Sequence, residues 1–197
     1  MTNSTETLLA MRAELEKIAK ITETEWRKFS SVTKVLQVPE KYMLQEAGQA
    51  VKHHHFLVDG LVRLFYTTPE GKDINKCFYG NNHIIGNLSA IILEEPSRFS
   101  IETLEPCTLV QFPIANLDTL SSNGLERLFD YGCRMMLVRT ERREAELLTM
   151  NAKQRFLQFI KNFPGYLDRI PQYHIASYLG ITPVALSKYK KQWLESQ

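Results

Sequence analysis

The chain has 197 residues, with 24 Lys and Arg against 22 Asp and Glu and a formal net charge of +2. Its 44% apolar and 23% charged residues are typical of a globular protein. No apolar run approaches the roughly 20 residues that a membrane span needs. The first residues also lack the basic start and apolar centre of a signal peptide. We therefore expect a cytoplasmic protein of one large or two small domains.

The cysteines argue against a disulfide framework. Cys77, Cys107 and Cys133 are odd in number and widely spaced. No C-x-x-C pair indicates zinc or an iron–sulfur cluster. We expect free thiols that are buried or half-buried, and no metal.

Two amphipathic helices are predicted at the start of the chain. Residues 5–20 place apolar side chains among charges at helical spacing. A second short helix is predicted over residues 24–29, with Thr24 near its cap and Trp26 and Phe29 facing inward.

From residue 31 the spacing of the apolar residues changes from a helical pattern to a strand-like one. Short strand-like runs follow one another as far as residue 112, with turn signals every 8–12 residues, which predicts a sandwich or a barrel. Asp59-Gly60, between two apolar runs, is the strongest hairpin signal. Residues 86–93 differ and predict a short helix set among the strands.

Three successive histidines, His53, His54 and His55, suggest a metal site at first sight. Alternate residues of a strand face opposite sides, so only two of the three share a face. No carboxylate or Cys ligand lies nearby in the sequence. We therefore predict a strand at the surface or at the rim of a pocket.

After Pro113 the pattern returns to helix. Residues 114–120 predict a short helix, Asn123-Gly124 a break, and residues 125–150 a long helix. A stripe on the long helix is formed by Leu125, Leu128, Phe129, Gly132, Met135, Met136, Arg139, Arg143, Leu147 and Met150. Such a stripe can pack on its own barrel or on a second copy of the helix. We favour a homodimer, because one barrel does not cover both sides of so long a helix.

The end of the chain predicts two short helices around a tight turn. The first spans residues 172–179 and contains Ala176, small enough for close approach of a second helix. Gly180 suits a left-handed helix end, Thr182 an N-cap and Pro183 a first helical position. This is the helix-turn-helix layout, whose second helix enters the DNA major groove. An ordinary helical hairpin in a core has the same spacing.

Charge favours the DNA interpretation. From residue 151 onward there are seven basic and two acidic residues, so this part carries +5 and the first 150 residues carry −3. A basic end on a mildly acidic chain is the electrostatic pattern of a phosphate-binding module.

The order of these elements resembles the Crp/Fnr family of bacterial transcription regulators. Arg169-Ile-Pro171, residues 175–183 and Leu186-Ser-Lys188 look like the compact form of the family found in Bacteroidetes-type sequences. Residues 59–66 are similar to the family's second hairpin. The resemblance implies an α+β fold with an N-terminal double-stranded β-helix, or jelly roll, of the cyclic nucleotide-binding type.

The resemblance also implies three domains. These are a barrel sensor domain with N-terminal helices (1–122), a long dimerisation helix (123–150) and a helix-turn-helix DNA-binding domain (151–197). No catalytic arrangement of residues stands out, so we do not expect an enzyme.

Ligands of this family are held in a phosphate-binding cassette. It begins Gly-Glu-Leu and carries Arg, then Ser or Thr, about ten residues later. Here the first part reads Gly86-Asn87-Leu88, and the second Ser97-Arg98, with the Arg one place late. A one-residue slip points a side chain to the other face of a strand. We therefore do not expect cyclic AMP as a cofactor and leave open another small effector or none.

The family's DNA contacts carry over in part. The implied contact residues are Thr182, Pro183, Val184, Ser187, Lys188, Lys190 and Lys191. Lys188 stands where the family usually has Arg, and Val184 where other branches have Glu. We expect a homodimer that binds double-stranded DNA through a recognition helix at about 183–192, with RNA polymerase as a further partner. The alternative is a ligand-binding or scaffold protein of the same fold that no longer binds DNA.

Overall fold

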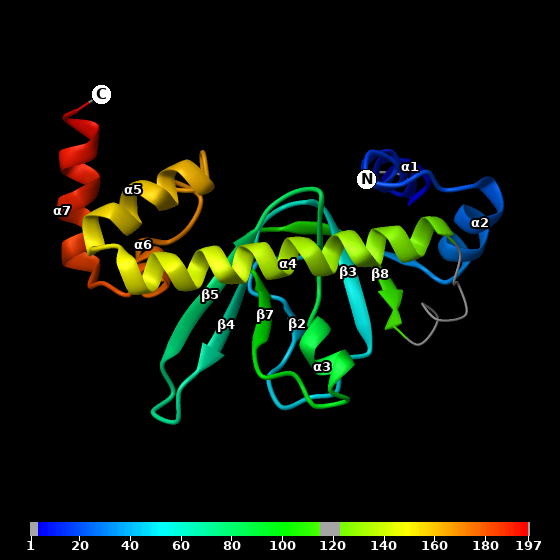
Figure 1. Cartoon of the computed structure of the whole chain (residues 1–197), viewed down its shortest axis with the longest axis horizontal. Coiled ribbons are helices and arrows are strands. Elements are labelled where there is room, and N and C mark those ends of the chain that lie inside the picture. Colours follow the sequence, from blue (N-terminus) through cyan, green and yellow to red (C-terminus); the bar gives the residue numbers. More distant parts are fainter. Residues whose placement is uncertain (1–3, 115–122, 197) are drawn as a thin grey trace. The chain divides into compact units, whose positions relative to one another are not determined.

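The structure is a computed structural model that describes residues 4–114 and 123–196 (Figure 1). The helices in these ranges are α1 (Ser4–Glu16), α2 (Glu23–Ser31), α3 (Leu88–Ile92), α4 (Asn123–Thr149), α5 (Ala152–Asn162), α6 (Gln172–Leu179) and α7 (Pro183–Leu194). The strands are β1 (Lys34–Val38), β2 (Met43–Gln45), β3 (His53–Asp59), β4 (Val62–Thr67), β5 (Asp73–Tyr79), β6 (His83–Ile85), β7 (Ser100–Thr103) and β8 (Cys107–Pro113). None of the described helices combines the length and hydropathy needed to cross a membrane.

The chain divides into two compact units. The first, here called the barrel unit, takes its described residues from 1–64 and 78–136. The second, here called the helical unit, takes them from 65–77 and 137–197. The helical unit therefore includes the outer part of the β4–β5 hairpin as well as the C-terminal helices.

The strands form two four-stranded sheets, ordered β1-β8-β3-β6 and β2-β7-β4-β5. Their facing sides share one core, in which Leu57, Val62, Ile101 and Leu109 are almost completely buried. This sandwich with the short helix α3 among its strands confirms the predicted fold class.

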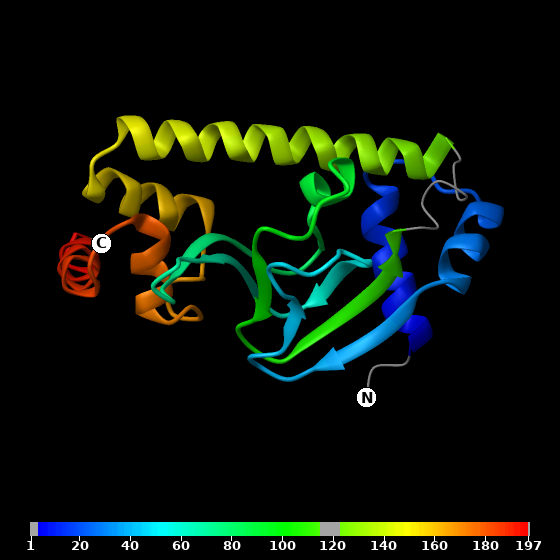
Figure 2. The ribbon, with the colours of Figure 1, turned by 90° about the horizontal axis from the view of Figure 1, so that it is seen from below.

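The N-terminal helices cover the outer side of the first sheet (Figure 2). Met11 of α1 and Phe29 of α2 share a second core with Phe56 of β3 and Phe112 of β8. The rings of Phe29 and Phe112 lie 5.3 Å apart. The two central strands of the first sheet, β3 and β8, are therefore largely buried on both faces.

Helix α2 begins earlier than the sequence predicted. Its N-cap is Thr22 and not Thr24, because Thr22 forms a capping box with Glu25. The inward positions of Trp26 and Phe29 are confirmed, since both side chains are buried.

The hairpin predicted at Asp59-Gly60 is wrong. Strand β3 belongs to the first sheet and β4 to the second, so this turn carries the chain from one sheet to the other. Gly60 has φ +119°, and its N–H donates a 2.9 Å hydrogen bond to the Asn81 side chain. A Cβ at Gly60 would collide with Cys107, so close approach as well as backbone conformation requires glycine here.

The long helix starts at Asn123 and has no break at Gly124. Gly124 lies in the first turn, where its N–H donates to Glu25 and a Cβ would come within 2.7 Å of Lys20 O. Glycine therefore permits close packing against the chain before α2. The short helix predicted over 114–120 falls, except for Ile114, outside the described residues.

Candidate nucleic-acid interface and effector cassette

The turn between α6 and α7 has the geometry that the sequence predicted. Gly180 is left-handed, with φ 66° and ψ 40°, and it ends α6. Thr182 caps α7 by accepting a hydrogen bond from Ala185 N at 3.2 Å, and Pro183 takes the first helical position. The helix Pro183–Leu194 slightly exceeds the predicted recognition helix.

The two helices pack through small and apolar side chains. Ala176 of α6 is 1% exposed, and Leu186 of α7 is completely buried. Phe156 and Phe159 of α5 lie in the same helical unit and are equally buried. The face of α7 opposite to Leu186 is therefore the one left to a partner.

That exposed face carries four of the residues predicted to contact DNA. Val184, Ser187, Lys188 and Lys191 are all exposed and follow one another at helical spacings of i, i+3, i+4 and i+7. We call these four residues the exposed α7 face. They combine one apolar group, one hydroxyl and two ammonium groups.

Lys190 is less available than the sequence predicted. Its ammonium lies 2.8 Å from Asp168 Oδ1, and its side chain is only 22% exposed. Ser187 also has an internal partner, since its hydroxyl donates to Gln172 at 3.2 Å. A phosphate that contacted Lys190 would have to compete with Asp168.

Helix α4 is joined to α6 by polar contacts within the helical unit. Arg143 donates a hydrogen bond to Tyr178 O, and its guanidinium lies 3.9 Å from the centre of the Tyr178 ring. Glu146, 8% exposed, accepts from Arg143 at 3.3 Å and from Asn162 at 3.1 Å. Arg143 therefore holds α4 to α6 within the helical unit.

A second connection joins the β4–β5 hairpin to α6, also within the helical unit. Asn75 N donates to Ser177 Oγ at 3.0 Å, and Ser177 Oγ donates to Asp73 O at 3.1 Å. The Asn75 amide nitrogen lies 3.2 Å from both Nδ1 and the carbonyl oxygen of His174. Asn75 and His174 are 4% and 6% exposed. These contacts could not be predicted from sequence, because their partners lie about 100 positions apart.

Two of the predicted cassette residues, Asn87 and Ser97, form hydrogen bonds with each other and with the backbone. Asn87 caps α3 by accepting from Ala90 N at 3.2 Å, and its amide donates to Ser97 Oγ at 2.9 Å. Ser97 Oγ in turn donates to Phe99 O at 2.6 Å. Asn87 and Ser97 are each 2% exposed. The two predicted pocket residues therefore meet, but they bind each other and the backbone.

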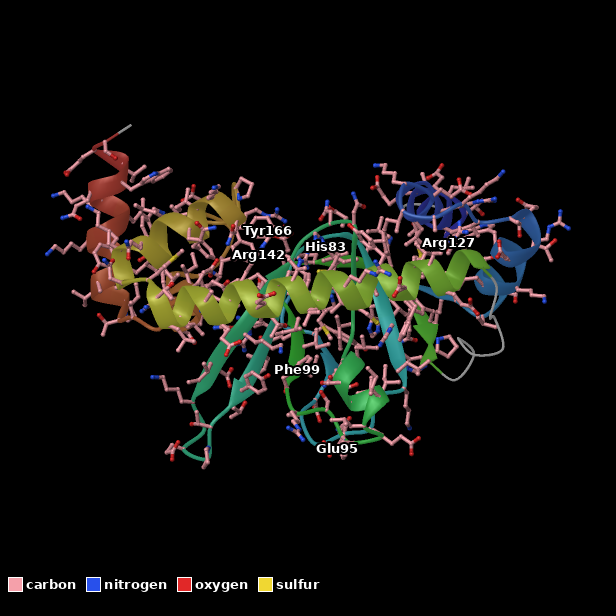
Figure 3. All side chains as sticks on the ribbon, viewed as in Figure 1. His83, Glu95, Phe99, Arg127, Arg142 and Tyr166 are labelled. Carbon is pink, nitrogen blue, oxygen red and sulfur yellow. The ribbon has the colours of Figure 1, made fainter. Side chains whose placement is uncertain are left out.

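Arg98, the charged residue of the predicted cassette, lies at the surface. Its guanidinium pairs with Glu95 at 2.7 Å, and its side chain is 71% exposed. Glu95 lies on the segment after α3 (Figure 3). The remaining predicted pocket residues, Gly86 and Leu88, are half-buried. Of the neighbouring residues Ser97 and Arg98, the neutral Ser97 is therefore buried and the charged Arg98 lies at the surface.

The histidine strand lies partly at the surface and partly in the core, and His53 lines a pocket together with Lys52, in line with the predicted pocket rim. His53 is exposed, but His54 and His55 are 7% and 3% exposed, and the His54 ring lies 5.8 Å from the ring of Phe112 in the core that the N-terminal helices share. Burial lowers the pKa of His54 to about 4, and burial with the charges of the neighbouring histidines lowers the pKa of His55 to about 4. A Cβ at Gly86 would lie 2.6 Å from His54 Nε2, so this ring packs directly beneath the start of the cassette.

The three cysteines are free, as predicted, with Cys107 buried and the others half-buried. Burial raises the pKa of the Cys133 thiol. Within the described ranges, no group of three or more His, Cys, Asp or Glu side chains is placed to hold a metal ion.

The apolar stripe of α4 separates into two faces. Leu128 is buried in the core that the N-terminal helices form. Large apolar side chains on another side are exposed, namely Phe129, Met136, Leu137, Leu147 and Leu148. At 100° per residue these five fall within about a third of the helix circumference. We call them the exposed α4 face.

Residues 35–123 match the family model described as the cyclic nucleotide-binding domain. A search of curated proteins found no match.

Solved structures match over most of the chain at low identity. FixK2 from Bradyrhizobium japonicum has a TM-score of 0.73 and 16% identity, over 84% of this chain and 86% of that one. The c-di-GMP-responsive global regulator CLP from Xanthomonas campestris has a TM-score of 0.70 and 12% identity, over 89% and 93%. A protein from Eubacterium rectale, described as a crp/fnr family transcriptional regulator, has a TM-score of 0.71 and 11% identity, over 89% and 85%.

The order of elements, a strand-rich region followed by the long helix α4 and the helices α5, α6 and α7, is thus shared with these solved structures. The predicted resemblance to the Crp/Fnr family is confirmed at the level of the fold.

Proposed function

We propose that this chain is a DNA-binding transcription regulator of the Crp/Fnr type, with α7 as its recognition helix. The observation that supports this most is the capped turn at Gly180, which leaves the exposed α7 face free of the core. Recognition helices contact base edges with their N-terminal residues and phosphates with basic side chains. The charge of +5 from residue 151 onward supplies the attraction to phosphate.

The regulator acts as a homodimer in this proposal, through the exposed α4 face. Leu137 and Leu148 are 67% and 78% exposed, and both belong to a face that no described element of the chain covers. A second copy of α4 buries this face by coiled-coil packing. A dimer also matches two half-sites about one helical turn of DNA apart.

The barrel unit does not bind cyclic AMP in this proposal. A cyclic phosphate needs a cation, and the buried Asn87–Ser97 pair supplies none. Arg98 would have to leave Glu95 and turn from the surface to provide one. Another effector, or none, is compatible with this closed arrangement.

The test compares two lysine variants of the full chain. Operator duplexes are first selected from a random DNA library, and affinity is measured by fluorescence anisotropy. Lys188→Ala is expected to weaken operator binding about tenfold or more, since a base or phosphate contact is lost. Lys34→Ala is the matched control, because it removes the same charge from an exposed position of β1.

Equal operator affinity of both variants would remove Lys188 from the interface. Complete absence of DNA binding by the wild-type chain would instead favour the alternative function, a ligand-binding or scaffold protein of this fold. Sedimentation of both variants checks that the oligomeric state is unchanged.

A further inference from the structure

The exposed α7 face contains one residue with no hydrogen-bonding group. Val184 is 80% exposed, the highest value among the large apolar side chains of the described residues. Its neighbours on the same face, Ser187, Lys188 and Lys191, are polar or charged. A single exposed valine does not by itself indicate a functional role. Val184, however, lies on the helix that the proposed function assigns to DNA recognition.

Val184 is the second residue of α7, directly after Pro183. The first turn of a recognition helix is the part that lies against the base edges in the major groove. The apolar group that those edges present is the C5-methyl of thymine, whereas the other bases present donors and acceptors. A valine over a donor or acceptor would remove its water and return no hydrogen bond.

The next turn of the helix carries the polar part of the readout. Lys188 lies four residues after Val184, which is about 6 Å along the helix axis. Base pairs are stacked about 3.4 Å apart, so about 6 Å along the protein helix corresponds to at most about two base pairs along the DNA axis. The ammonium of Lys188 suits the acceptors O6 and N7 of guanine.

We propose that Val184 reads the 5-methyl group of a thymine in each operator half-site, with a guanine contacted by Lys188 within about two base pairs. This inference rests on the proposed function. It assigns sequence preference to a residue that carries neither charge nor hydrogen-bonding groups. Base preference at that position then depends on a methyl group alone.

The experiment removes one partner of the contact at a time: the C5-methyl group of thymine in the DNA, or most of the Val184 side chain in the protein. In the selected operator, each thymine is replaced in turn by deoxyuridine, which differs from thymine by the C5-methyl alone. Affinities are measured by fluorescence anisotropy for the full wild-type chain and for Val184→Ala. Because Val184 is 80% exposed, the substitution leaves the core of the helical unit intact.

The proposal expects one thymine position per half-site at which deoxyuridine weakens wild-type binding about fourfold, the effect of one lost methyl contact. Val184→Ala, whose shorter side chain makes less contact with the methyl group, should distinguish the thymine and deoxyuridine operators less than wild type does. Ser187→Ala is the matched control on the same face and should retain the fourfold difference.

Two outcomes would overturn the proposal, and they differ from failure of the proposed function. One is wild-type affinity that no deoxyuridine replacement changes. The other is a deoxyuridine effect that is the same in wild type and Val184→Ala. In both cases DNA binding itself persists. If the chain bound no duplex DNA, the proposed function would fail and this inference with it.

Discussion

Arg143 provides the sharpest test of how α4 is attached to the helix-turn-helix. Its side chain makes three contacts in the helical unit: with Tyr178 O, with the Tyr178 ring and with Glu146. Arg143→Met keeps the length of the side chain but removes all three. Glu146 is 8% exposed and would keep only Asn162 as a partner.

The expected loss of stability is about 3 kcal/mol. Removing one partner of a buried ion pair costs roughly 3–5 kcal/mol, and a hydrogen bond to a charged group about 1.5–3 kcal/mol. These values are not additive, and the Arg143 side chain is 19% exposed, so the lower end applies. The variant should also bind operator DNA less tightly, since α6 is less firmly held.

The assay is urea denaturation of the full chain, combined with hydrogen exchange of the α6 amides. Arg142→Met is the matched control, because Arg142 is the preceding residue on α4 and is exposed (Figure 3). Its effect should stay within about 0.5 kcal/mol. If both variants lost the same stability and α6 exchanged equally in both, Arg143 would not hold α4 to α6.

Three further predictions concern other parts of the chain. With folded pKa values of about 4 for His54 and His55 and about 6.5 in the unfolded chain, the unfolded state takes up protons between pH 6.5 and 4 that the folded state does not. Stability should therefore fall as the pH decreases through that window. In the His54→Phe variant, the urea midpoint should fall less between pH 7 and pH 5 than it does in wild type. An equal fall in both proteins would contradict this prediction. Gly180→Ala should lower stability by about 1 kcal/mol, because φ is +66° there, and an unaltered thermal midpoint would argue against it. Leu148→Glu, at a site 78% exposed, should convert a dimer to a folded monomer in sedimentation, and a persistent dimer would exclude this face as the interface.

The parts of the fold that the sequence predicted depend on local signals. Gly180 and Thr182 specify a helix end and a helix start by their own conformational preferences, and the structure confirms both. The short helix α3 was also predicted from residues close together in the chain. Asp59-Gly60 has an equally strong local signal, yet its two strands pair with different sheets. Strand pairing is decided by distant partners, which a turn motif does not contain.

The candidate site was predictable to a similar degree. The exposed α7 face follows from helical periodicity, because Leu186 fixes which side is buried. The ion pair of Lys190 with Asp168 and the contacts of Arg143 were not predictable, since they join elements separated by turns of unknown geometry. The burial of His54 could not be predicted from the alternation of side chains along the strand. That alternation shows which residues share a face, but not that the N-terminal helices cover it.

The most direct test of the central claim is fluorescence anisotropy of the full chain with its selected operator at two salt concentrations, with and without cyclic AMP. The account predicts binding that weakens steeply as salt increases, since released counterions accompany each phosphate contact. It also predicts no change on addition of cyclic AMP, because Asn87 and Ser97 satisfy each other and Arg98 is held by Glu95. Absent or salt-insensitive binding would contradict the assignment as a DNA regulator. Binding that required the nucleotide would contradict the closed cassette.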